Sequence, residues 1–160
     1  MKTNILLAVD AAPSFGGQHV RGAVEIACEL ARPGIDQVVV LHVHEFSVPQ
    51  LARAMADHGG ASGRQVVDDV VAELRSAGVR AGGLIREADF GHVAQTILAV
   101  AREFDARLIV LGARGRTDLP RTPCDVATHL LHVSTLPVLI APASSVAAGS
   151  VGSVGSVAGR

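Results

Sequence analysis

The chain of 160 residues has little aromatic character, with four phenylalanines and neither tryptophan nor tyrosine. Valine, leucine, isoleucine and alanine must therefore fill the core, which suits a buried parallel sheet covered by helices. Cysteine is also scarce. The two present, Cys28 and Cys124, lie far apart and in no metal-ligand spacing. This usage is typical of a reduced cytosolic protein, so a cytoplasmic location is expected.

Other absences limit the function. The sequence contains no signal-peptide pattern and no apolar run of about 18 residues, so we expect neither secretion nor a membrane segment. The formal net charge is −1 at pH 7, which does not favour nucleic acid or an anionic membrane as a partner. Histidine pairs at positions 42/44 and 129/132 lack a third ligand at a suitable spacing, so no metal site is expected.

Strand and helix signals alternate along residues 1–142. Short apolar runs predict five strands, and stretches of helical periodicity between them predict helices. The predicted strands are Ile5–Val9, Gln37–His44, Val79–Glu87, Arg107–Leu111 and Pro137–Ala141. The predicted helices are Gln18–Arg32, a short helix after Val48, Arg64–Ala77, Gly91–Phe104 and Pro123–Val133. Glycines at 59, 60 and 63 indicate a flexible joint before Arg64.

The composition changes abruptly after Pro142. Residues 143–160 are almost entirely alanine, serine, glycine and valine, with three consecutive Gly-Ser-Val triplets at 149–157. Such a segment cannot bury enough apolar surface to offset the entropy of ordering. We therefore expect one domain over residues 1–142 and a disordered tail over residues 143–160.

Alternating strands and helices predict an open five-stranded parallel α/β sheet, of order 3-2-1-4-5, with helices on both faces. Ligands of such sheets bind at the carboxyl ends of the strands, where the strand order reverses. Here the reversal lies between the first strand, which ends beside Asp10, and the fourth strand, which ends at Leu111. Asp10 and the segment 112–115 are therefore expected to face one another across a crevice.

A glycine pair follows the fourth strand directly. Gly112 and Gly115 form Gly-x-x-Gly, and Arg114 and Arg116 make the loop basic. Glycines let backbone N–H groups approach an anion closely, and the next helix N-terminus adds positive potential. The layout is typical of a phosphate-binding loop. The alternative is that the same glycines serve merely to form a tight turn.

Five segments, in order and spacing, resemble the universal stress protein family over about residues 4–142. They are ILLAVD at 5–10, LHV at 41–43, GHVA at 91–94, LIVLGARGR at 108–116 and PVLI at 137–140. The resemblance implies the adenine nucleotide alpha-hydrolase-like fold, a cytoplasmic location and a homodimer that pairs through Val138, Leu139 and Ile140. It also implies that Val9, Asp10 and Val38 contact the adenosine part of a nucleotide.

The second half of the family's ATP-binding motif is missing. ATP-binding members follow Gly-x-x-Gly by nine residues and then Gly-Ser or Gly-Thr, but Cys124, Asp125 and Val126 occupy the aligned positions here. A carboxylate near a triphosphate would cost a few kcal/mol at an effective dielectric of about 20. An alternative role for Asp125 is to cap the following helix. An alternative role for Asp10 is to hydrogen-bond the backbone of the turn that follows it.

These features favour a non-catalytic, dimeric stress-response protein with a degenerate nucleotide site. Any cofactor would be a weakly bound adenine nucleotide, AMP or ATP. We assign no residue a catalytic role and expect no metal ion. The alternative is an adenine-nucleotide-binding protein or slow ATPase that uses the Gly112/Gly115 loop.

Overall fold

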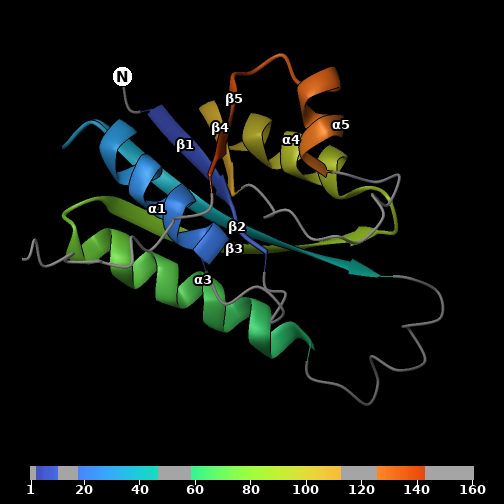
Figure 1. Ribbon diagram of the computed structural model, residues 1–160, viewed down its shortest axis with the longest axis horizontal. Coiled ribbons are helices and arrows are strands. Elements are labelled where there is room, and N and C mark those ends of the chain that lie inside the picture. Colours follow the sequence, from blue (N-terminus) through green and yellow to red (C-terminus); the bar gives the residue numbers. More distant parts are fainter. Residues whose placement is uncertain (1–2, 11–17, 47–58, 113–125, 143–160) are drawn as a thin grey trace, which may run out of the picture.

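The computed structural model (Figure 1) describes residues 3–10, 18–46, 59–112 and 126–142. The predicted 143–160 tail, the short helix after Val48 and the loop 113–125 lie outside these ranges. Five strands form one sheet in the order β3-β2-β1-β4-β5, and every neighbouring pair is parallel. The strands are β1 Thr3–Ala8, β2 Asp36–Phe46, β3 Arg80–Asp89, β4 Ala106–Gly112 and β5 Val138–Ala141. This confirms the predicted fold class and strand order.

Helices cover both faces of the sheet. The described helices are α1 Gln18–Leu30, α3 Gly59–Ser76, α4 Val93–Glu103 and α5 Val126–Val133. In Figure 1, α1 and α3 lie on one side of the sheet and α4 and α5 on the other. Alternation along the strands feeds two cores, since Ile5 and Leu7 pack with α1 and α3 while Leu6 packs with α4 and α5. Both cores are aliphatic, as the scarcity of aromatic residues predicts.

Helix α3 corrects the sequence prediction. It begins at Gly59 rather than Arg64 and runs through the glycines that predicted a joint. One of them, Gly63, lies directly on β2: a Cβ built there would be 2.4 Å from Cδ2 of His42. Gly83 similarly lets α3 approach β3, because a Cβ there would meet Val67 Cγ1 at 2.4 Å. Gly63 and Gly83 therefore serve close helix–sheet packing.

Strands β2 and β3 extend further than predicted. Their register runs unbroken from Gln37 opposite Arg80 to Phe46 opposite Asp89, whereas β1 ends at Ala8. The two strands therefore project beyond the end of β1. The rings of His44 and Phe46 meet edge to face on this projection, with centroids 4.6 Å apart.

A buried carboxylate joins several elements at the amino ends of the strands. Asp36 is 2 % exposed and accepts hydrogen bonds from Thr3 Oγ1, from the Arg32 backbone N–H and guanidinium, and from Arg107 Nη2. The two ion pairs measure 3.0 Å each. The hydrogen bonds from the Arg32 side chain, helped by those from Thr3 and Arg107, hold the pKa of Asp36 far below its usual range.

Candidate functional site

The end of β1 lies between the ends of β2 and β4. Ala8 is opposite Leu111 of β4, and the Val9 N–H donates to the Leu41 carbonyl at 2.8 Å. Val9 is 7 % exposed, and Asp10 after it is exposed. Gly112, the last residue of β4, is half-buried. The fold thus brings Val9, Asp10 and Gly112 together at the edge where the strand order reverses.

Val38 does not lie at this edge. It is the third residue of β2, it lies opposite Ile5, and it is fully buried in the core beneath α1 and α3. A ligand at the carboxyl ends of the strands cannot reach it without opening that core. Val38 is therefore a core residue, which corrects its assignment to the adenosine pocket.

His42 occupies the position on β2 beside Val9. Continuing the register of Ala8 with Leu41 by one residue places Val9 opposite His42. His42 is 7 % exposed, and its Nδ1 lies 3.1 Å from the Val9 carbonyl oxygen. Because a carbonyl only accepts, Nδ1 must carry the proton and donate. The Val9 N–H thus bonds to Leu41 and the Val9 C=O to His42, which are consecutive residues of β2.

The other predicted site residues are in the loop after β4. Arg114, Gly115, Arg116 and Asp125 lie outside the described residues, so their roles remain predictions. The loop leaves β4 at Gly112, which is opposite Ala141 of β5, and α5 follows it from Val126. The residues on either side of this segment, Gly112 and Val126, are therefore placed, and Gly112 lies at the edge that carries Asp10.

A second turn is anchored at the same edge of the sheet. Glu45 Oε1, near the end of β2, accepts a hydrogen bond from the Gly91 N–H at 2.7 Å. Gly91 has a φ of 81°, a conformation in which a side chain would be strained. Helix α4 begins two residues later, at Val93. This hydrogen bond fixes the start of α4 relative to the carboxyl ends of the strands, where Asp10 lies.

Comparison with known proteins agrees with this geometry. The model of the universal stress protein family matches residues 1–142. The chain belongs to this family. No curated protein matches it. Among solved structures, a universal stress protein family member from Burkholderia pseudomallei is 29 % identical, with 88 % of this chain and 96 % of that one covered and a TM-score of 0.65.

Two other structures of the family contain nucleotides. A family protein from Arabidopsis thaliana with AMP bound is 18 % identical, covers 89 % and 93 % of the two chains, and has a TM-score of 0.67. The universal stress protein from Archaeoglobus fulgidus in complex with dAMP is 20 % identical, covers 87 % and 97 %, and has a TM-score of 0.65. At these identities, the likeness establishes a shared fold.

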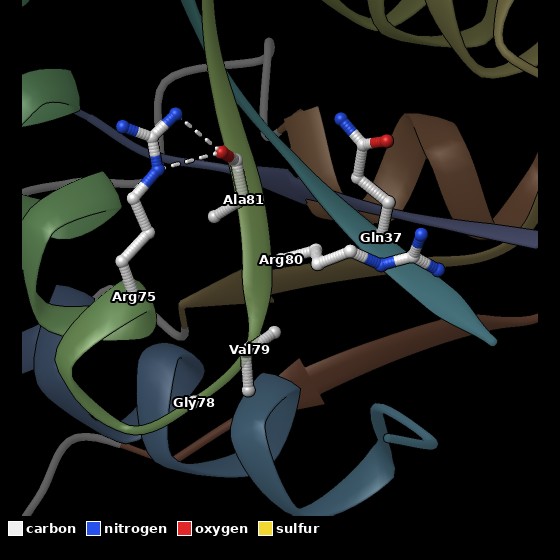
Figure 2. Close-up of a pocket in the computed structure, with 6 residues that line it drawn as sticks. All are labelled: Gln37, Arg75, Gly78, Val79, Arg80 and Ala81. Atoms are coloured by element: carbon white, nitrogen blue, oxygen red, sulfur yellow. Dashed lines mark hydrogen bonds between the residues drawn. The ribbon is translucent and has the colours of Figure 1, made fainter. Parts of the chain in front are cut away.

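The chain described here also has a surface depression of about 400 Å³, which Figure 2 shows and which lies away from the sheet edge that carries Asp10. Its lining residues are Gln37, Arg75, Gly78, Val79, Arg80 and Ala81. Both arginines already donate to backbone carbonyls, Arg75 to Ala81 at 2.8 and 3.0 Å and Arg80 to Gly34 and Ile35 at 3.0 Å. The depression lies at the amino ends of β2 and β3, so it is separate from the edge that carries Asp10.

Neither a metal site nor a membrane span is found in the part of the chain that the structure describes. No group of three or more His, Cys, Asp or Glu side chains there is arranged to hold a metal ion. None of the helices in the same ranges is both long and apolar enough to cross a bilayer.

Proposed function

We propose that this universal stress protein is a non-catalytic, cytoplasmic regulatory protein of the stress response that binds adenine nucleotides weakly. The observation that carries the proposal is the arrangement of Val9, Asp10 and Gly112 at the switch point of the sheet. Support comes from the structures of the Arabidopsis and Archaeoglobus proteins with AMP and dAMP. The weak affinity follows from the loop sequence, which lacks the Gly-Ser or Gly-Thr pair.

The nucleotide preference should run toward fewer phosphates. Gly112 and Gly115 can approach a first phosphate, and Arg114 and Arg116 offer planar donors matched to its oxygens. Asp125 stands where the ATP-binding motif has a neutral residue, so added phosphates would meet a like charge. AMP should therefore bind better than ADP, and ADP better than ATP.

Thermal unfolding with AMP, ADP and ATP at equal concentrations, without magnesium, tests the proposal. A ligand that binds only the native state raises the unfolding temperature according to its concentration relative to its dissociation constant. The expected order of shifts is AMP, then ADP, then ATP. Asp125→Ser combined with Cys124→Gly should increase the ATP shift. A larger shift with ATP than with AMP in the wild type would contradict the proposed preference. ATP hydrolysis by the purified protein would favour the slow-ATPase alternative.

We also propose that the protein is a homodimer paired through β5. This strand is at the edge of the sheet, and its Val138-Leu-Ile140 segment carries no charge to discourage pairing. Ile140 is 37 % exposed, and Leu131 on the adjacent helix α5 is 56 % exposed. Light scattering at micromolar concentration should give the mass of a dimer. Ile140→Asp should give a monomer, and dimeric mass in that variant would contradict pairing through β5.

A further inference from the structure

One buried histidine connects three elements next to the candidate site. His42 lies on β2, its Nδ1 bonds to the Val9 carbonyl, and α3 covers its ring through Gly63. A Cβ at Gly63 would be 2.4 Å from Cδ2 and 2.7 Å from Nε2 of the ring. The ring is therefore held against α3 on one side and by Val9 on the other. Few rotations are open to it.

The bond to Val9 acts at the point where the chain leaves the sheet. β1 ends at Ala8, and the Val9 N–H still bonds to β2 through the Leu41 carbonyl. The His42 ring holds the other backbone group of the same residue. Asp10 follows immediately, so the direction in which it leaves the sheet depends on how the Val9 peptide is oriented.

We propose that His42 is a positioning residue for the nucleotide site. By donating from Nδ1 to the Val9 carbonyl, its ring orients the Val9–Asp10 peptide and so presents Asp10 to the ribose or base. The inference rests on the proposed nucleotide binding and assigns His42 a role that it exerts through Val9 and Asp10, without touching the ligand. A small displacement of a binding group is enough to lower affinity strongly.

The structure specifies the tautomer that this role requires. Neutral His42 must carry its proton on Nδ1, which leaves Nε2, on the side of α3, as an acceptor. Ring nitrogen chemical shifts of selectively labelled protein report this tautomer without any ligand. The expected result is that the neutral ring carries its proton on Nδ1 rather than on Nε2. A ring protonated only on Nε2 would overturn the proposal, whatever the nucleotide affinity.

Three substitutions separate positioning from simple packing. His42→Leu keeps the apolar volume and removes the donor. The amide nitrogen of Asn can occupy the place of Nδ1, whereas that of Gln reaches only the place of Nε2. Calorimetric titration with AMP should therefore show at least about tenfold weaker binding for His42→Leu and His42→Gln. His42→Asn should stay within about threefold of the wild type.

His132 provides a matched control. Its Nδ1 also lies close to a backbone carbonyl, at 2.8 Å from Thr128 O, but it is exposed in the last turn of α5. His132→Leu should leave AMP affinity unchanged. The unfolding temperature of each ligand-free variant, measured in parallel, separates affinity from stability.

The outcomes distinguish the two proposals. Equal AMP affinity in the wild type and His42→Leu would overturn the role of His42 and leave the proposed function standing. Loss of affinity in His42→Asn equal to that in His42→Leu would also overturn it, because the restored donor would then be irrelevant. No AMP binding by the folded wild type would instead refute the proposed function, and the role of His42 in binding with it.

Discussion

The two ends of the sheet differ in how they place an aspartate: Asp36 is buried at the amino ends, and Asp10 is exposed at the carboxyl ends. At the amino ends, buried Asp36 accepts hydrogen bonds from Thr3, Arg32 and Arg107, so a buried carboxylate is fully paired. At the carboxyl ends, β1 stops early, Asp10 is exposed and one buried ring, His42, holds the last carbonyl. The first arrangement stabilises the fold, and the second lies at the proposed nucleotide site. Stability and binding should therefore respond to different substitutions.

The largest effect is expected at the amino end. Asp36→Ala removes the acceptor for three side chains and leaves Arg32 only its bond to Thr3 and Arg107 only its bond to Leu30. The free energy of unfolding should fall by about 3 kcal/mol, because several hydrogen bonds to a charged acceptor are lost together and each contributes about 1.5–3 kcal/mol before solvent partly replaces it. Urea denaturation measures it.

The matched control is the exposed pair of Arg86 and Glu103, 3.1 Å apart. Glu103→Gln should cost less than about 0.5 kcal/mol. AMP affinity of the folded Asp36→Ala protein should equal that of the wild type. A change in the AMP affinity of the folded variant would show that the two ends are not independent.

A smaller effect is expected at the carboxyl end from Gly63→Ala. Alanine favours a helix interior by about 1 kcal/mol over glycine, but its Cβ would overlap the His42 ring, and overpacking costs about 1–3 kcal/mol. The variant should be less stable by about 1 kcal/mol and should bind AMP more weakly.

The double variant His42→Ala with Gly63→Ala sharpens this test, because alanine lacks all the ring atoms that the new Cβ would meet. In that background, Gly63→Ala should be neutral or stabilising. Equal effects of Gly63→Ala in both backgrounds, measured by chemical denaturation as a double-mutant cycle, would contradict the proposed contact.

Acid should weaken the amino end by a further, modest amount. The pKa of Asp36 is lower in the folded protein than its ordinary value of about 3.9. As the pH falls below about 4, the unfolded state therefore binds the proton first and stability declines. Between pH 4 and pH 3 the stability gap between the wild type and Asp36→Asn should narrow by about 1 kcal/mol. A gap that does not change with pH would contradict the ionised, hydrogen-bonded state of Asp36.

The sequence predicts the carboxyl end better than the amino end, because periodicity and glycine motifs reveal strand ends directly. Strand order and the position of Asp10 and Gly112 follow from such patterns. The partners of Asp36 come from residues 3, 32 and 107, and no local pattern signals contacts so distant in the chain. A sheet places them together only after it has formed.

Two errors at the carboxyl end have a physical origin. Val38 belongs to a uniform valine run, from which a sequence cannot tell the middle of a strand from its end. Gly63 indicates a break by helix propensity, yet its role is to admit the His42 ring. His42 directly follows Leu41, the residue that pairs with the last residue of β1. Its position next to Val9 can therefore be recognised only when the end of β1 is known.

Backbone amide shifts during a titration of the labelled wild-type protein with AMP test the central claim most directly. The account predicts saturable changes at Val9, Asp10, His42 and Gly112, with none at Thr3, Asp36 and Arg107. Changes centred on the amino ends of the strands or on the depression of Figure 2, or no change at millimolar AMP, would contradict it.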